Sequence, residues 1–285
     1  MIRTSRRAFV KAAGLGVVAA AVPAGARGMA NEESSGNGIT GSEVGFTLGM
    51  ASYTFREFGL DETLKMTSRL GLTKIAFKNF HLALDATRTE IEEVVDRVRT
   101  AGLDLYGGGV IYMRNEQEVD QAFDYAQYAG MRVIIGVPNH ELLPLVERKV
   151  QQYDIQLAIH NHGPGDQVYP TPESAYELVK DLDPRMGLCI DVGHTQRAGV
   201  DPSESVERFF DRLHDVHMKD VSAASREGGT VEVGRGVIDV PKLLSTLVRL
   251  DYRGVVAFEH EKDGNDPLAG AAESVGFTRG VMATL

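Results

Sequence analysis

The chain contains one cysteine, and its basic residues are outnumbered by acidic ones. A single cysteine among 285 residues excludes an internal disulfide bond and a zinc site built from several cysteines. There are 30 Lys and Arg against 40 Asp and Glu, and the first 30 residues hold five of these bases and no acid. The chain after residue 30 is therefore strongly acidic and would repel a phosphate backbone, so we do not expect nucleic-acid binding.

The sequence also has no apolar run near its start that could span a bilayer. The run over residues 12–22 is about 11 residues long, whereas a transmembrane helix takes about 20. It follows Arg6, Arg7 and Phe9, a pattern that resembles the twin-arginine export signal. We therefore expect a signal peptide over residues 1–30, recognised by the twin-arginine export machinery, and a periplasmic or otherwise exported protein. A short membrane anchor and a fortuitous basic start are the alternatives.

The rest of the chain divides into a linker and one domain. Residues 31–44 are rich in Gly, Ser, Glu and Asn, which predicts a flexible linker. From residue 45 to residue 285, apolar runs alternate with helical patterns. Strands are expected over residues 46–53, 74–80, 103–112, 132–137, 155–160, 186–192, 215–219 and 254–259. Helices are expected over residues 61–70, 89–100, 115–128, 141–152, 172–182, 202–213, 240–250 and 267–282.

A glycine-rich phosphate-binding turn is missing after the first expected strand. An open, doubly wound sheet would favour such a turn, but the segment reads Tyr53-Thr54-Phe55-Arg56. Eight strand–helix units in about 240 residues instead fit a closed barrel of parallel strands with helices outside. The sequence therefore predicts an α/β fold, a (β/α)8 TIM barrel forming a single domain over residues 45–285.

Acidic residues and histidines follow four successive strands. The fifth to eighth expected strands close with His160 and His162, Asp191 and His194, His217 and Lys219, and Glu259 and Glu261. A barrel carries its chemistry at the C-terminal ends of its strands, and neighbouring strand ends can surround one point. Mixed nitrogen and oxygen donors at such a point predict a divalent-metal site.

The alternation of side chains along a strand selects among these candidates. His160, Asp191 and Glu259 each end an apolar run and His217 follows Val216, so we expect these four to be the metal ligands. A histidine at a strand end is also often a structural, hydrogen-bonded residue. We expect one divalent ion, with Mn²⁺ first and Co²⁺, Fe²⁺, Zn²⁺ or Mg²⁺ as alternatives.

Further polar residues are expected around this centre. Lys78, His162 and Glu259 are the candidate catalytic residues, because each could move a proton or face a developing charge. His81, His194, Lys219 and Arg235 are the candidate substrate contacts. Tyr53, Arg56, Tyr112 and Arg114 are expected at the rim. A surface charge is the alternative for Lys78, and a plain turn is the alternative for the segment around Arg235.

The strand-end motifs carry a family resemblance. The segments at residues 158–162, 189–194, 216–220 and 257–259 resemble the xylose isomerase-like TIM-barrel superfamily, which includes sugar isomerases, ketose epimerases, inosose dehydratases and apurinic endonucleases. In its ketose epimerases, Glu, Asp, His and Glu hold the metal, and these positions become His160, Asp191, His217 and Glu259. The resemblance therefore implies the same metal centre, with histidine in place of the first glutamate.

That replacement affects the expected reaction. The resembling epimerases move a proton with two metal-bound glutamates, and here only Glu259 is present. The Lys78–His81 element and the His160–His162 pair resemble an exported subgroup often described as sugar phosphate isomerase/epimerase. Some members of that subgroup cleave 3-keto-glycosides by elimination. We expect a metal-dependent isomerase, epimerase or carbon–oxygen lyase that enolises a keto-sugar.

Two other functions and the assembly state remain open from the sequence. A metal-dependent phosphoesterase of the apurinic endonuclease type would gather more acidic ligands from the earlier strands, where none is obvious. A non-catalytic sugar-binding protein of the cell envelope would use the same residues without proton transfer. The expected partner is a small-molecule sugar or keto-glycoside, and a homo-oligomer is left open.

Overall fold

The computed structural model of the protein describes residues 44–285. The expected signal peptide over residues 1–30 lies outside this range, as does the expected linker apart from residue 44. Among residues 44–285, no helix combines the length and apolar character needed to cross a membrane.

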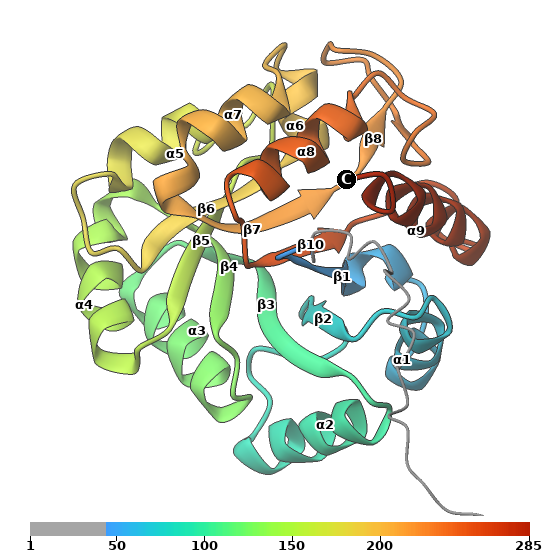
Figure 1. Cartoon of the computed structure of the whole chain (residues 1–285). Coiled ribbons are helices and arrows are strands. Elements are labelled where there is room, and N and C mark those ends of the chain that lie inside the picture. Colours follow the sequence, from blue (N-terminus) through green and yellow to red (C-terminus); the bar gives the residue numbers. More distant parts are fainter. Residues whose placement is uncertain (1–43) are drawn as a thin grey trace, which may run out of the picture. The chain divides into compact units, whose positions relative to one another are not determined.

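Eight parallel strands close into a barrel (Figure 1). Their order around the barrel follows the chain, and the last strand pairs with the first. The strands are β1 (Thr47–Ala51), β2 (Lys74–Phe77), β3 (Asp104–Met113), β4 (Val133–Pro138), β5 (Gln156–His160), β6 (Met186–Asp191), β7 (Leu213–Met218) and β10 (Val255–Phe258). The structure confirms the predicted (β/α)8 barrel.

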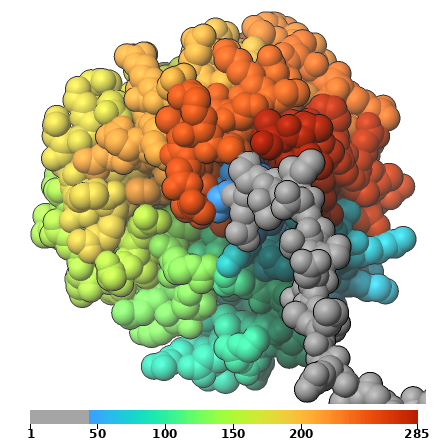
Figure 2. Space-filling model, in the orientation of Figure 1, coloured from blue at the N-terminus to red at the C-terminus, as the bar shows by residue number. Residues whose placement is uncertain are grey.

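Helices connect the strands and cover the outside of the barrel (Figure 1). They are α1 (Leu60–Arg69), α2 (Arg88–Thr100), α3 (Glu116–Tyr128), α4 (Leu143–Tyr153), α5 (Pro172–Val179), α6 (Val192–Arg197), α7 (Pro202–Arg208), α8 (Val240–Arg249) and α9 (Leu268–Met282), with short 3₁₀ turns η1 (Ser52–Phe55), η2 (His140–Leu142) and η3 (Phe210–Arg212). In Figure 2, the colours follow the chain around the visible face of the molecule. The Arg279 guanidinium of α9 donates to the carbonyls of Leu70 and Gly71 just after α1, so the last helix lies beside the first.

Side-chain caps fix where several of these helices begin. Thr87, Asn115, Thr171 and Asp239 each accept a hydrogen bond from the backbone N–H three residues further on. Each bond satisfies one of the N–H groups that have no partner inside the helix. The helix starts therefore follow from local sequence.

Two apolar layers hold the barrel together. The larger layer lies between strands and helices and includes most of the buried Leu, Ile, Val and Phe side chains. The smaller layer consists of Ala51, Ala76, Tyr106, Val133, Ile135, Ala158, Cys189 and Ala257. We call this smaller set the inner cluster. Its members alternate along the strands with members of the larger layer, so the inner cluster fills the barrel interior.

The structure departs from the expected elements mainly after β6 and β7. Helix α6 begins directly at the end of β6, because the Asp191 carboxylate accepts the backbone N–H of His194 at 2.7 Å. The expected helix over residues 202–213 ends at Arg208 as α7 and is followed by η3. After β7, the chain forms a small antiparallel pair, β8 (Asp220–Val221) with β9 (Thr230–Val231).

Candidate active site and metal centre

The four expected metal ligands come together at the ends of β5, β6, β7 and β10. We call His160, Asp191, His217 and Glu259 the quartet. Each quartet residue stands two positions after another residue on the inner side of its strand. The pairs are Ala158 with His160, Cys189 with Asp191, Asp215 with His217, and Ala257 with Glu259; Asp215 is placed inside by its contact with the Cys189 thiol at 3.7 Å. Since side chains two positions apart share a face, the quartet points into the barrel.

The donor atoms of the quartet lie close to one another. One ligand atom from each of the four residues lies within 4.8 Å of all the others, and all four residues are buried. The Nε2 of His160 is 3.1 Å from the Nδ1 of His217. The Oδ2 of Asp191 is 3.4 Å from that His160 nitrogen, and the Oε2 of Glu259 is 3.3 Å from the Nδ1 of His217.

This arrangement fits a divalent metal. The Oδ2 of Asp191 and the Oε2 of Glu259 are buried and share one cation among the described residues, the ammonium of Lys219, at 2.9 and 2.7 Å. Two buried carboxylates carry more negative charge than one ammonium neutralises, and a cation bound between them would balance it. Two imidazoles and two carboxylates form the mixed donor set that transition-metal ions accept.

Three members of the quartet have charges that suit metal binding; for His217, burial alone would lower the pKa, but the Glu259 carboxylate raises it. Burial lowers the pKa of His160 to about 3, so this imidazole is neutral and can act as a ligand. Burial would raise the pKa of Asp191 and of Glu259, but the Lys219 ammonium and nearby histidines hold both well below the usual range. The carboxylates are therefore ionised.

Lys219 lies against the quartet rather than on the wall of the pocket. Its Nζ is 2.9 Å from the Oδ2 of Asp191 and 2.7 Å from the Oε2 of Glu259, and it also pairs with Glu261. Its side chain is almost completely buried. Lys219 was expected to contact substrate, but its ammonium is fully engaged by carboxylates in this structure.

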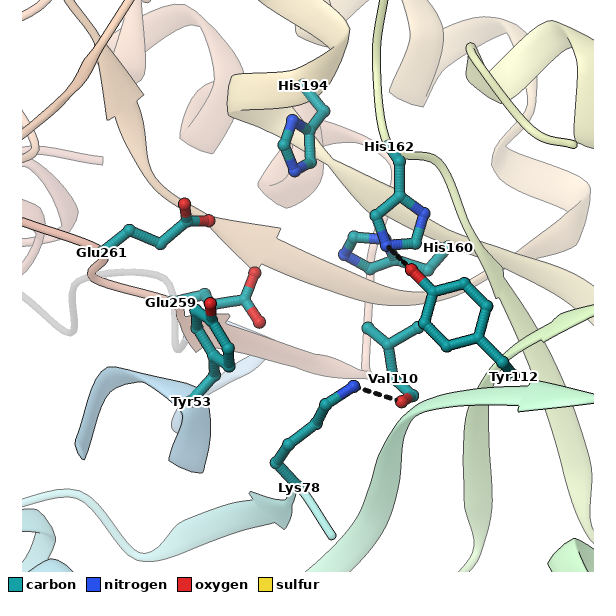
Figure 3. A pocket seen from close by; sticks show the side chains of 9 residues that line it. All are labelled: Tyr53, Lys78, Val110, Tyr112, His160, His162, His194, Glu259 and Glu261. Atoms are coloured by element: carbon teal, nitrogen blue, oxygen red, sulfur yellow. Dashed lines mark hydrogen bonds between the residues drawn. The ribbon is translucent and has the colours of Figure 1, made fainter. Parts of the chain in front are cut away.

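A pocket opens directly over two members of the quartet (Figure 3). It has a volume of about 230 Å³. Its lining residues are Tyr53, Lys78, Val110, Tyr112, His160, His162, His194, Glu259 and Glu261. The structure thus brings the three candidate catalytic residues and the candidate substrate contact His194 to one cavity.

Lys78 and His162 line the pocket from the segments just after β2 and β5. The Nζ of Lys78 donates a hydrogen bond of 2.5 Å to the carbonyl of Val110. The Nε2 of His162 lies 3.1 Å from the hydroxyl of Tyr112, and the two rings stack with centroids 5.7 Å apart. Burial lowers the pKa of Lys78 against the pull of Glu259, and burial also lowers the pKa of His162. The lowered pKa makes the Lys78 ammonium a stronger acid, and it keeps the His162 imidazole in the neutral form that can accept a proton.

Two expected substrate contacts are not in this pocket. The Nε2 of His81 lies 2.9 Å from the hydroxyl of Thr63 and 3.0 Å from the carbonyl of Phe58, so the ring ties the β2–α2 connection to α1. Arg235 forms an exposed ion pair with Glu273 of α9, in which its Nη2 lies 2.8 Å from the carboxylate. As placed, both side chains support the fold instead of lining the cavity.

Three residues contribute to the site although no role in it was predicted for them from the sequence. The side chain of Asn161 accepts the backbone N–H of Asp191 at 3.0 Å and donates to Thr195 at 3.1 Å, so it positions a quartet residue from outside the barrel. The Val110 contribution is a main-chain carbonyl, which any residue could supply. Glu261, for which no role in the site was expected, lines the pocket and pairs with Lys219.

Comparison with known proteins places this geometry in a family. The sequence model of the xylose isomerase-like TIM barrel matches residues 42–281. The chain is 32% identical over 142 residues to the rhizopine catabolism protein MocC of Rhizobium meliloti, which covers 45% of this chain and 43% of that protein. It is 30% identical over 129 residues to an inosose dehydratase of Geobacillus kaustophilus, covering 40% and 41%. The matches thus span less than half the length of these relatives.

A solved structure shows the same fold. The 3-keto-D-glucoside 4-epimerase YcjR of E. coli superposes with a TM-score of 0.64 at 14% identity, covering 82% of this chain and 99% of that one. At this identity, the similarity concerns the barrel and not the reaction.

Proposed function

The chain belongs to the xylose isomerase-like TIM-barrel family, and from this premise we propose that it is a metal-dependent enzyme that enolises a keto-sugar. The partial similarity to an inosose dehydratase supports a polyhydroxylated carbonyl substrate. A keto-sugar has an acidic C–H beside its carbonyl, so its enolisation needs a base and a means to stabilise negative charge on oxygen.

The observation that carries this proposal is that quartet residues and two side chains able to exchange protons line the same cavity. His160 and Glu259 of the quartet line the same cavity as Lys78 and His162. Neither Lys78 nor His162 pairs with a carboxylate among the described residues, whereas Lys219 contacts three. Both therefore remain available to a sugar.

A divalent ion held by the quartet would act as a Lewis acid toward the oxygens of the sugar. His162 would remove the proton beside the carbonyl, because the residue lines the cavity and burial lowers the pKa of its imidazole, which keeps the ring neutral. Its Nε2 would act as the base once the sugar displaces the Tyr112 hydroxyl, which lies 3.1 Å away, while the stacked Tyr112 ring holds the imidazole in place. The ammonium of Lys78 would face the negative charge that develops, or return a proton.

The histidine at position 160 argues against proton transfer between two carboxylates on opposite faces of a sugar. Its neutral ring contributes a nitrogen to the quartet, and Glu259 is the one carboxylate of the quartet that lines the cavity. We therefore assign the base role to His162 and leave Glu259 as a ligand. For the metal, we propose Mn²⁺ first, because two carboxylates suit harder ions than a set of thiolates would.

The experiment that tests this function follows proton exchange in D₂O. Metal-loaded protein is incubated with methyl 3-keto-glucoside and with free ketoses, and NMR reads deuterium at the carbon beside the carbonyl. We expect incorporation that His162→Ala lowers by ~10²-fold with metal content unchanged. His140→Ala is the matched control, since His140 contacts the carbonyl of Val168 at 3.0 Å and does not line the pocket.

Two outcomes would overturn the proposal. Sugar binding without any exchange, in protein that retains its metal, would indicate an envelope sugar-binding protein. Phosphoester cleavage without exchange would indicate a phosphoesterase. The latter is not supported by the pocket, whose lining carboxylates, Glu259 and Glu261, both follow the last barrel strand.

A further inference from the structure

A second cavity adjoins the pocket above the quartet. Its volume is about 300 Å³, against about 230 Å³ for the first, and Lys78, Val110 and Tyr112 line both. Sites for small ligands commonly measure ~300–1,000 Å³. The two cavities together therefore suit a ligand with two joined parts, of which the reacting sugar ring fills only the first.

The lining of this second cavity combines apolar and polar side chains. Leu84 and Ile111 provide apolar surface, whereas Arg114, Glu118 and Gln121 provide charged and amide groups. A sugar ring has the same division, with C–H groups on its faces and hydroxyls at its edges. A flat aromatic group would leave these polar side chains without partners, which costs binding energy.

Local contacts hold the three polar side chains in place. The guanidinium carbon of Arg114 lies 5.3 Å from the ring centre of Tyr112. The Oε2 of Glu118 accepts the backbone N–H of Arg114 at 2.7 Å, and the Nε2 of Gln121 donates to the carbonyl of Leu84 at 3.1 Å. These contacts orient the side chains while the guanidinium, the other Glu118 oxygen and the Gln121 oxygen remain for hydroxyl groups.

We propose that this second cavity is a subsite for a second sugar ring, the leaving group of a 3-keto-disaccharide, and that Lys78 protonates the departing oxygen. The inference rests on the proposed enolisation and assigns it to an elimination. Arg114, Glu118 and Gln121 are then the residues that determine specificity for the leaving group.

Lys78 stands where the two cavities meet, which is where the bond between the two rings would lie. In the proposed reaction, His162 takes the proton from C2, and the electron pair left behind forms a C1=C2 double bond. The bond from C1 to the bridging oxygen breaks, and Lys78 gives that oxygen a proton. The products are an unsaturated 2-hydroxy-3-keto sugar and a free sugar, so neither an oxidant nor a reductant is needed. Burial lowers the pKa of Lys78, which makes its ammonium a better proton donor.

The first experiment measures specificity for the leaving group. The kcat/KM for a 3-keto-disaccharide is compared with that for methyl 3-keto-glucoside, which offers the same reacting ring without a second one. We expect Arg114→Ala to lower the ratio of the two values by about 10-fold, as the loss of a charged hydrogen bond would. Arg208→Ala is the control, because Arg208 also covers an aromatic ring, Phe209 at 5.0 Å, but lines neither cavity.

The second experiment tests the proton donor. A nitrophenolate leaves without protonation, whereas a sugar alkoxide does not, so the need for a general acid depends on the leaving group. We expect Lys78→Met to slow cleavage of the 3-keto-disaccharide by ~10²-fold and cleavage of nitrophenyl 3-keto-glucoside by much less.

The outcomes separate this inference from the proposed function. Deuterium exchange into methyl 3-keto-glucoside with an unchanged specificity ratio in Arg114→Ala would overturn the subsite and leave enolisation intact. Equal losses on both leaving groups in Lys78→Met would overturn the proton-donor role. Absence of exchange from every keto-sugar would overturn the proposed function itself.

Discussion

Lys219 is the residue on which the charge balance of the centre depends. Its buried ammonium contacts Asp191, Glu259 and Glu261. These carboxylates repel one another unless a cation lies between them. Lys219 is one such cation, and a divalent ion held by the quartet would be a second. We expect the lysine and the metal to share the task of neutralising the same buried charge.

The first prediction concerns this shared task. Lys219→Met should lower the free energy of unfolding in the presence of a chelator by about 3 kcal/mol, because it leaves buried carboxylates unpaired. Added Mn²⁺ should then raise the melting temperature of the variant more than that of the unaltered protein. Lys180→Met, which removes an exposed pair with Glu177, is the control and should change little. An equal response of both proteins to Mn²⁺ would contradict the prediction.

The second prediction separates two histidines of one strand. His217 belongs to the quartet, whereas the Nε2 of His214 lies 3.0 Å from the carbonyl of Pro184 near the start of β7. His217→Ala should therefore lose most of its bound metal, and His214→Gln should keep it. Elemental analysis of dialysed protein measures the stoichiometry. Full metal occupancy in His217→Ala would exclude the quartet as the site.

At the scale of elements, the segment after β7 owes its shape to one carboxylate. The buried Asp220 side chain accepts backbone N–H groups from Val221 at 2.8 Å, Gly234 and Gly236 at 3.0 Å, and Ile238 at 3.2 Å. The position that a Cβ would take at Gly236 lies 2.1 Å from the Oδ1 of Asp220. The glycines therefore allow the backbone to wrap an aspartate rather than a ligand.

The third prediction follows from this contact. Asp220→Asn replaces a carboxylate oxygen with an NH₂ group that faces N–H donors, so buried donors lose their acceptor. We expect the free energy of unfolding to fall by about 2 kcal/mol, measured by urea denaturation, with metal content retained. Asp251→Asn at an exposed turn provides the comparison and should be nearly neutral. A loss of metal in Asp220→Asn would show that this segment supports the quartet directly.

The strand ends could be predicted from the sequence, whereas the shape of the segment after β7 could not. The strand ends at His160, Asp191, His217 and Glu259 were predictable because a period-two pattern and a closed barrel determine which side chains point inward. Arg235 was expected near the substrate for a different reason, because the glycines on either side of it would let the backbone approach a ligand, but it does not line the pocket. The contacts of Asp220 with this loop, more than ten residues away, leave no local signal in the sequence.

A similar limit applies to the second cavity and to Lys219. Tyr112 and Arg114 were expected at the rim. The cavity beside them, however, depends on how β3, α3 and the segment after β2 pack against one another, which the sequence pattern does not reveal. Lys219 stands at a strand end like the quartet residues, so its position in the barrel was predictable. Its partners were not, because a long flexible side chain can turn toward solvent or toward carboxylates with the same backbone.

At the scale of the whole molecule, the centre exists only after the chain has folded. The quartet comes from the ends of four strands, and its members are spread over residues 160–259, so an unfolded chain has no preformed site. A mixed nitrogen and oxygen site binds Mn²⁺ more weakly than Cu²⁺ or Zn²⁺. The compartment in which the chain folds therefore decides which ion it receives.

The last prediction joins this argument to the N-terminal sequence, which lies outside the described residues. We propose that the protein folds and binds its metal in the cytoplasm and is then exported folded through the twin-arginine machinery, guided by Arg6 and Arg7. Replacing both with lysine keeps the charge but removes the paired guanidinium groups, so the unprocessed precursor should accumulate inside the cell. The same change at Arg3 and Arg27 is the control and should leave processing intact. Cell fractionation with immunodetection measures the distribution, and normal export of the Arg6→Lys, Arg7→Lys variant would exclude this route.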